Sequence, residues 1–300
     1  MKKFTFSLLF IVISFASIGQ QLHFMSQYLQ HNSMINPGAA GMAKTNFIGL
    51  SYRNQWSSFP GNPKTTMAYG DVLLEKYKAG IAGYVYRDET GPTSRTGLQM
   101  AYSYHILSRD EKSKFGIGIE LRGLQYAIDK NKLITALGDD PALGGAASKF
   151  GFDAGFGVYY TNDKFSGGVA VSQLIQSKLQ LADVPNSKTS GRLYRHYNFS
   201  ANYKLPTGDD TYLIPNALFR AVQNAPSEFE LGMRLEYKEK MWVGVNYKFK
   251  QSYSLQTGFK IADMVSFAYS YDAYNAPISS FDGGSGGHEI GIKYEFGKRY

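Results

Sequence analysis

The feature that most constrains the fold is an alternation of apolar and polar residues, repeated in block after block along the chain. In the block 115–122, Phe, Ile, Ile and Leu alternate with Gly, Gly, Glu and Arg. The blocks 197–205 and 229–238 keep the same period of two. Because successive side chains of a strand point to opposite faces, each block predicts a strand with one apolar and one polar face.

The blocks also have a characteristic length and number. Each spans about nine to eleven residues, the length that a tilted membrane-crossing strand needs. Fourteen blocks begin near residues 44, 64, 78, 95, 113, 150, 164, 191, 212, 227, 241, 252, 264 and 286. An even number is typical of single-chain bacterial barrels. The pattern therefore predicts an all-β fold, a transmembrane antiparallel β-barrel of about 14 strands in the outer membrane, formed by residues 44–300.

Two blocks fit this pattern less well. The block 64–74 can be placed in either register, because apolar side chains occupy both of its faces. The block 212–222 contains Pro215, and proline is tolerated only at strand ends, edges and bulges.

The N-terminus predicts export. Lys2 and Lys3 precede an apolar stretch and the small-residue triplet Ser17-Ile18-Gly19, as in a secretory signal cut before Gln20. An uncleaved anchor is the alternative, although about fifteen apolar residues fall short of the roughly twenty that a spanning helix needs. Residues 1–19 are thus expected to be a cleaved signal peptide, and 20–43 a lead-in to the barrel, either a simple coil or a plug inserted from the periplasmic side.

Composition narrows the class of protein. Mean hydropathy is −0.29 and no later stretch of apolar residues is long enough for a spanning helix. With 0 Cys, neither disulfides nor thiolate metal sites can stabilise the fold. The net charge of +8 is scattered, whereas nucleic-acid binding needs a dense basic stripe. The 23 Tyr and 20 Phe suit the aromatic girdles of a membrane barrel better than the alternative, a soluble periplasmic sandwich or propeller.

Catalytic and cofactor sites find little support in the sequence. No two of the five His stand at a metal-ligand spacing on one regular element. Ser103 and His105 share a strand face, as a lipid hydrolase would need, but a polar barrel wall contains many such pairs by chance. We therefore expect a protein that is not an enzyme and has no cofactor.

Several short motifs occur in order along the chain: Ser26-Gln27-Tyr28, Asn36-Pro37-Gly38, Arg53-Asn54-Gln55-Trp56, Asp140-Pro141-Ala142 and Gly287-His288-Glu289-Ile290. This series resembles the PorP/SprF family, outer-membrane proteins of the type IX secretion system of Bacteroidetes, and it spans nearly the whole mature chain. The sequence departs from the family at Gly38-Ala39-Ala40, where Ala-Tyr-Ala is frequent, and in the residues that follow Phe296.

The resemblance implies an integral outer-membrane barrel that supports export or surface attachment of a cargo protein carrying a C-terminal sorting domain, such as a gliding-type adhesin. Other expected partners are translocon components, a periplasmic peptidoglycan-binding lipoprotein and membrane lipid. The partner-binding candidates are Asn36, Pro37, Arg53, Asn54, Gln55, Trp56, Asp140, Pro141, His288 and Glu289.

Purely structural roles for these residues are the alternative to partner binding. Trp56 is also expected as an interfacial anchor, and His288 and Glu289 as a cap of the last strand. The segment 128–149 is longer than an ordinary connection, and such loops usually have a role, whether capping the mouth, folding into the lumen or contacting a partner. The alternative function is a diffusion porin or a small-molecule (lipid or solute) transport barrel, because fourteen strands leave room for a channel.

Overall fold

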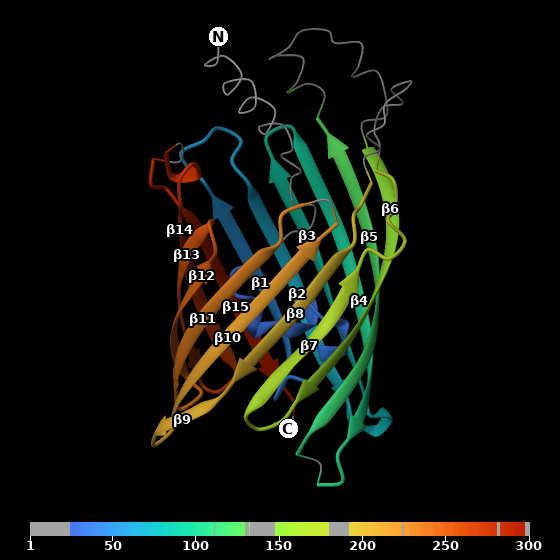
Figure 1. The fold of residues 1–300 in the computed structure, drawn as a ribbon, viewed down its shortest axis with the longest axis vertical. Helices are drawn as coiled ribbons and strands as arrows, with labels where there is room; N and C mark the ends of the chain where they lie inside the picture. Colours follow the sequence, from blue (N-terminus) through green and yellow to red (C-terminus); the bar gives the residue numbers. More distant parts are fainter. Residues whose placement is uncertain are drawn as a thin grey trace, which may run out of the picture.

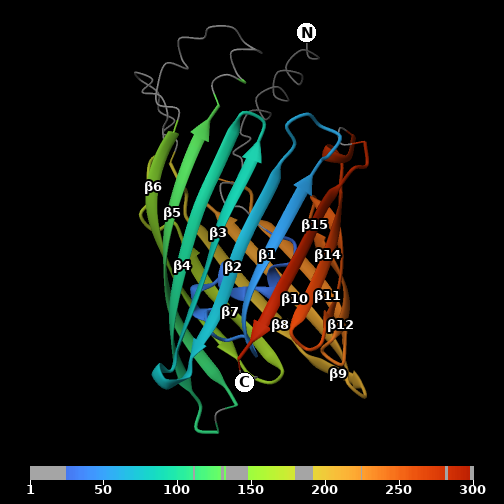
Figure 2. The ribbon, with the colours of Figure 1, turned by 180° about the vertical axis from the view of Figure 1, so that it is seen from behind.

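The computed structural model describes residues 25–110, 112–129, 132, 148–179, 192–223, 225–280 and 283–297. The strands form one antiparallel sheet in which neighbours in sequence are neighbours in space. Strand β1 (Asn46–Gln55) also pairs with the last strand, β15 (Gly287–Phe296), so the sheet closes into a barrel (Figures 1 and 2). Closure leaves no backbone edge exposed to hydrocarbon.

The remaining strands are β2 (Lys64–Leu74), β3 (Ala79–Thr90), β4 (Thr93–Leu107), β5 (Lys114–Ile128), β6 (Ser148–Thr161), β7 (Phe165–Ser172), β8 (His196–Tyr203), β9 (Leu205–Gly208), β10 (Thr211–Val222), β11 (Glu228–Tyr237), β12 (Met241–Lys248), β13 (Ser252–Ile261) and β14 (Val265–Tyr274). Both β8 and the short β9 pair with β10, so the described wall has fourteen strand positions. The predicted barrel of about 14 strands is confirmed.

The two ambiguous blocks have physical explanations. Pro215 lies inside β10, but the wall beside it is interrupted, because β8 pairs with β10 up to Asn216 and β9 from Leu213 onward. The proline therefore faces a gap in the ladder on that side, which its missing N–H tolerates. In β2, Met67 and Tyr69 point inward and are buried. Their inward packing is why both faces of this block look apolar.

The barrel has two different ends. At the end that we call the turn end, short connections at 75–78, 108–113, 162–164, 238–240 and 262–264 join the strands. At the opposite end, the loop end, the connections include 56–63, 173–195 and 275–286. The last strand runs toward the turn end (Figure 1).

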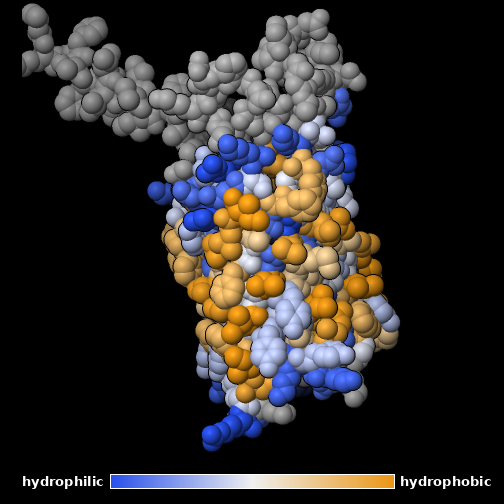
Figure 3. All heavy atoms as spheres, turned by 90° about the vertical axis from the view of Figure 1, so that its right-hand side faces the viewer, coloured by the Kyte–Doolittle hydropathy of each residue, from blue (hydrophilic) through white to orange (hydrophobic). Residues whose placement is uncertain are grey.

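The outer face is apolar where a membrane would contact it. On β5 the alternation places Ile117, Ile119 and Leu121 outward, and Leu121 is 68% exposed. Figure 3 shows hydrophobic side chains over the middle of the barrel and hydrophilic ones toward both ends. Transmembrane barrels show this apolar band because only hydrocarbon contacts it.

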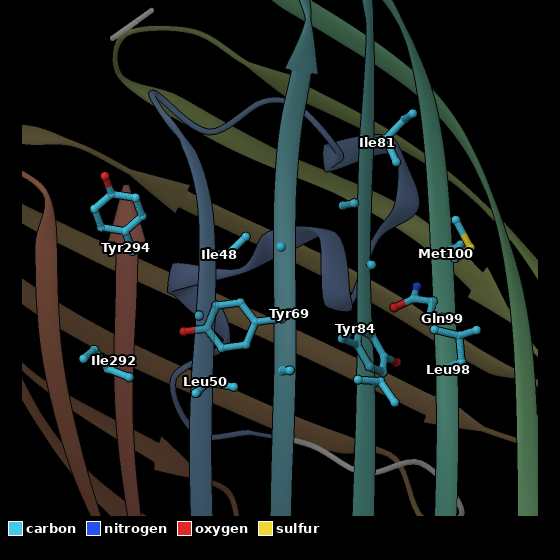
Figure 4. Close-up of a pocket in the computed structure, with 16 residues that line it drawn as sticks. Ile48, Leu50, Tyr69, Ile81, Tyr84, Leu98, Gln99, Met100, Ile292 and Tyr294 are labelled. Carbon is cyan, nitrogen blue, oxygen red and sulfur yellow. The ribbon is translucent and has the colours of Figure 1, made fainter. Parts of the chain in front are cut away.

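A groove of about 710 Å³ interrupts this outer face beside β2. Its lining includes the small residues Ala68, Gly70 and Gly83. Larger apolar side chains, among them Ile48, Leu50 and Leu98, also line it (Figure 4). In the part of the chain that the structure describes, no helix has the length and hydropathy to cross a bilayer.

The segment 25–43 lies inside the barrel (Figures 1 and 2). It contains three short 3-10 helices, η1 (Tyr28–Gln30), η2 (Asn32–Met34) and η3 (Pro37–Ala39), and we call it the luminal segment. Two further 3-10 turns, η4 (Glu75–Tyr77) and η6 (Ile278–Ser280), lie in connections. The apolar clusters of the interior form between the luminal segment and the wall, for example Met25 with Phe47, Met67 and Tyr69.

Candidate functional site

A buried charged cluster holds the beginning of the luminal segment. The guanidinium of Arg53 on β1 pairs with Asp272 on β14 and, at 3.2 Å, with Glu289 on β15. Ser26 completes the cluster: its backbone N–H donates to Glu289 at 2.8 Å, and its hydroxyl donates to Asp272 at 2.7 Å. Arg53 Nη1 also donates to the Ser26 hydroxyl at 2.8 Å. Three wall strands and the luminal segment therefore meet at one ion-pair network.

The neighbouring residues continue this attachment around the wall. Gln256 on β13 donates to the carbonyl of Ser26 at 2.8 Å, and the Tyr28 hydroxyl donates to Asn216 on β10 at 3.2 Å. Farther along the segment, Asn198 on β8 donates to the carbonyl of Ile35 at 3.1 Å. The bonds from Gln256 and Asn198 satisfy backbone carbonyls that no regular secondary structure pairs, as burial requires.

Asn36 and Pro37 start η3 on the far side of the lumen. The Asn36 side chain caps the turn by accepting from the Gly38 N–H at 2.9 Å, and Pro37 occupies the first position, where a missing N–H costs nothing. The same side chain donates to the carbonyls of Val158 on β6, at 2.9 Å, and Val169 on β7, at 3.2 Å. The Asn-Pro pair thus shapes the segment and fixes it to two strands.

Glycines on the wall allow the segment to approach closely. A Cβ added at Gly118 on β5 would collide with the backbone of Pro37, and one at Gly116 would collide with the carbonyl oxygen of Gly38. A Cβ at Gly38 itself would lie 2.9 Å from the backbone N of Tyr159. The alternating glycines of β5 therefore mark the place where backbone packs on backbone.

The polar pair on β4 also binds the segment. The Ser103 hydroxyl donates to the carbonyl of Gly38 at 2.9 Å, and His105 Nε2 lies 2.8 Å from the carbonyl oxygen of Ala40. Both side chains are buried. On β2, Asp71 accepts from the N–H of Gly41 at 2.7 Å. The two residues that we considered as a hydrolase pair have a structural role in this arrangement.

His31 lies in the apolar part of the lumen. Its ring centroid is 3.7 Å from that of Tyr69 and 5.4 Å from that of Phe47. Burial lowers the pKa of His31 well below its usual range, and the positive charge of Lys293 lowers this pKa further. The imidazole is therefore neutral in the docked segment.

The other motif residues lie at the loop end. Gln55 donates to the hydroxyl of Tyr274 at 2.5 Å, and the half-buried Trp56 ring packs on the Tyr274 ring with centroids 5.6 Å apart. Asn54 accepts from Asn62 in the following loop. His288 bonds to the hydroxyl of Tyr269 through Nδ1 at 2.7 Å. These four side chains form the rim of β1 and β15.

The structure brings some of the candidate residues together and separates others. Arg53 and Glu289 meet in the charged cluster, while Asn36 and Pro37 lie across the lumen, against β5, β6 and β7. Asp140 and Pro141 lie outside the described residues, as do residues 1–24. Sequence reasoning did not select Ser26 or Asp272. Ser26 stands in a motif that resembles the family, but nothing in the alternation singles out Asp272 from other inward polar residues.

A comparison with protein families gives one match, to the type IX secretion system membrane protein PorP/SprF, over residues 17–294. The chain belongs to this family. The match covers all five ordered motifs, and PorP/SprF proteins are secretion membrane proteins rather than an enzyme family. No curated protein matches the sequence.

Solved structures similar to this PorP/SprF barrel are outer-membrane barrels. The CymD monoaromatic hydrocarbon channel matches with a TM-score of 0.52 at 11% identity, covering 94% of this chain and 96% of that one. A TodX deletion mutant, also a monoaromatic hydrocarbon channel, matches at 0.50 and 10% identity, covering 93% and 95%. Omp33 of Acinetobacter baumannii matches at 0.48 and 10%, covering 85% and 100%. The first two support the outer-membrane barrel fold, and at such identities they say nothing about the ligand.

Metal chemistry has no candidate in the described residues, where no group of three or more His, Cys, Asp or Glu side chains could hold an ion. Several polar side chains of the lumen instead bind the backbone of the luminal segment. The arrangement is therefore suited to fixing one segment inside a rigid wall, and to presenting loops and rim residues at its ends.

Proposed function

We propose that this PorP/SprF barrel is a recognition scaffold of the type IX secretion system, which binds a secreted cargo protein with a C-terminal sorting domain and supports its export or surface attachment. Family membership places the chain in that system. The cargo, whether a gliding-type adhesin or another surface protein, is part of the proposal.

The observation that carries the proposal is the filled lumen. The luminal segment is hydrogen-bonded to strands β1, β2, β4, β6, β7, β8, β10, β13, β14 and β15. A segment attached on so many sides obstructs a diffusion path, whereas a porin of this size needs an aqueous channel. The filled lumen favours binding at the ends of the barrel over passage through it.

The loop end is the proposed cargo-binding end. Outer-membrane barrels place short turns in the periplasm and longer loops outside, so we assign the loop end to the cell surface. Asn54, Gln55, Trp56 and His288 lie there, and β5 ends and β6 begins at that end, before and after the stretch of sequence that contains Asp140 and Pro141. A rigid scaffold that carries binding residues on its loops is a common arrangement in binding proteins.

In this proposal the ten candidate residues have two kinds of role. Arg53 and Glu289 are 3% and 1% exposed, so they act by positioning the luminal segment and the rim, as Asn36 and Pro37 do. The rim and loop residues make the contact with the partner. A peptidoglycan-binding lipoprotein or translocon component would then approach from the turn end.

The test combines a deletion with affinity purification from the native host. Removing residues 133–146 should leave a folded, heat-modifiable barrel and strongly reduce recovery of a surface protein with a sorting domain. Trp56→Ala tests the rim in the same way, and Tyr77→Ala, exposed at the turn end, is the matched control. Equal partner recovery from all of these proteins would contradict the proposed binding end.

The rival function, a porin or small-molecule transporter, is separated by conductance. The purified protein in a planar bilayer should be closed, and loss of the gene should impair export of a surface protein. Steady ion conductance by the intact protein, together with unchanged export in the deletion strain, would favour the porin instead.

A further inference from the structure

A polar cavity, which we call the inner cavity, lies on the turn-end side of the luminal segment. It has a volume of about 290 Å³ and is covered by Leu29, Gln30 and Asn32 of the luminal segment. Its walls come from the turn-end parts of β1, β8, β10, β11, β12, β13, β14 and β15. This cavity is distinct from the Arg53 cluster and from the loop-end rim.

The cavity holds more cations than carboxylates. Its cationic residues are Lys44, Lys204, Arg234, Lys260 and Lys293, and its acidic residues are Glu236, Glu239 and Glu295. Each carboxylate is therefore shared between two cations: Glu295 lies 2.7 Å from Lys260 and 3.0 Å from Lys293, and Glu236 lies 2.7 Å from Arg234 and 3.7 Å from Lys204. The cavity lining therefore carries two more positive than negative charges.

One donor group in the cavity is also left over. Arg234 binds Glu236 through Nη2 and packs on the Trp242 ring at 4.7 Å, while its buried Nε has no hydrogen-bond partner among the described residues. Buried N–H groups of this kind are rare unless a ligand or water satisfies them. An excess of positive charge inside a wall of low dielectric favours an anion as the occupant.

The shape of the site favours a chain over a small ion. A further cavity, of about 570 Å³, adjoins the inner cavity, and we call it the outer cavity. The two cavities share Ala43, Lys44, Lys204 and Glu239. The outer cavity reaches the turns at 108–113 and 162–164. Its lining contains three further cations, Lys112, Lys114 and Lys164, and two further carboxylates, Asp110 and Asp163. The two cavities thus form a cationic track from the turn end of the barrel to the luminal segment, with Trp242 and Ile214 as apolar contacts at its inner end.

We propose that this track binds an acidic peptide, an extended segment with carboxylate side chains that enters from the turn end. The inner cavity would take one or two carboxylates between Arg234, Lys260 and Lys293, and Gln30 and Asn32 would bond to the peptide backbone. This site goes beyond cargo binding at the loop end and is tested without any cargo.

The experiment uses the full-length barrel in detergent micelles and a fluorescein-labelled, end-capped hexapeptide in which Glu alternates with Gly. Fluorescence anisotropy should show saturable binding that weakens with added salt, because part of the attraction is screened. The Gln counterpart of the peptide should bind about tenfold or more weakly, since it lacks the charge-assisted hydrogen bonds. In a Trp56→Phe background, Trp242 is the remaining tryptophan of the chain, and its emission should change on binding.

The variant Arg234→Gln/Lys260→Gln should weaken binding of the Glu peptide by about tenfold or more and remove most of its salt dependence. Lys260→Arg keeps the charge and should retain binding, which guards against a folding defect in the double variant. Lys250→Gln removes one positive charge at an exposed site at the loop end and should bind as the parent does. The proposal is overturned if the Glu and Gln peptides bind alike, if inorganic phosphate competes at equal concentration, or if binding leaves Trp242 emission unchanged.

Discussion

Replacing Arg53 by Met should release the luminal segment. The guanidinium is the ion-pair partner of both Asp272 and Glu289, whose side chains are 0% and 1% exposed. Removing one partner of a buried ion pair costs about 3–5 kcal/mol, because the other charge stays dehydrated. In this barrel the carboxylates regain water when Ser26 leaves, since its N–H and hydroxyl cover both of them. The cost therefore falls mainly on docking of the segment.

The size of the effect follows from that free energy. At about 1.4 kcal/mol per factor of ten, a loss of about 3 kcal/mol raises the undocked population by about 100-fold. The chain has 0 Cys, so Ser33→Cys places a single thiol in η2, at a position that is 8% exposed. When opening and closing are fast, the rate of maleimide labelling follows the undocked population. Labelling of Cys in the Arg53→Met protein should be about 100 times faster than in the parent.

A matched control removes an arginine from an exposed pair. Arg87 lies 2.8 Å from Glu89, and their side chains are 60% and 53% exposed. Because such surface pairs contribute at most about 1 kcal/mol, Arg87→Met should leave the labelling rate within a few-fold of the parent rate. If the Arg53→Met barrel migrates as folded protein and yet labels at the parent rate, the charged cluster does not hold the segment.

Three other predictions concern the wall and the segment. Gly118→Ala should lower the unfolding temperature and speed thiol labelling, because the added methyl group overpacks Pro37 at a cost of about 1–3 kcal/mol, whereas Gly208→Ala, where nothing crowds the new group, should not. Leu121→Arg should destabilise the barrel in lipid bilayers, lowering the free energy of unfolding measured by denaturant titration by about 2–4 kcal/mol. An unchanged unfolding midpoint would contradict the assignment of Leu121 to the lipid face. The low pKa of docked His31 means that the undocked segment binds more protons, so docking is complete above about pH 6.5 and weakens as the pH falls below it. Acid also slows the thiolate reaction itself, equally in both proteins, so the ratio of the labelling rate in the parent to that in His31→Gln should rise as the pH falls.

The wall of the barrel could be predicted from the sequence because lipid imposes a strict rule. Every strand must present apolar side chains outward at alternate positions, and the described strands other than the short β9 begin within five residues of the expected starts. β5 follows the rule along its membrane-facing part, with Ile117, Ile119 and Leu121 outward. No long-range information is needed for such a pattern.

The interior could not be predicted in the same way, because it depends on which part of the chain fills it. Met67 and Tyr69 are inward because they pack on Met25 and His31 of the luminal segment. Gly116 and Gly118 stand at alternate positions of a strand, but the alternation alone does not show that η3 packs on them. A period of two identifies the inner face of a strand but not the backbone that approaches it.

The ion-pair network lies beyond sequence reasoning for a related reason. Arg53 and Asp272 are 219 residues apart and meet only because β1 closes the sheet against β15, next to β14. Arg53 and Glu289 were selected separately, each from a motif that resembles the family. The register of closure, in which Arg53 stands opposite Glu289, is what turns two motifs into one cluster.

The charges along the barrel axis differ in sign from one side of the luminal segment to the other. The Arg53 cluster contains two carboxylates for one cation, whereas the inner cavity contains five cations for three carboxylates. An acidic peptide that entered from the turn end would be attracted up to the segment and repelled by Asp272 and Glu289 beyond it. A bound peptide would therefore lie below the docked segment and bond to Gln30 and Asn32, so its binding should stabilise docking and slow thiol labelling at position 33.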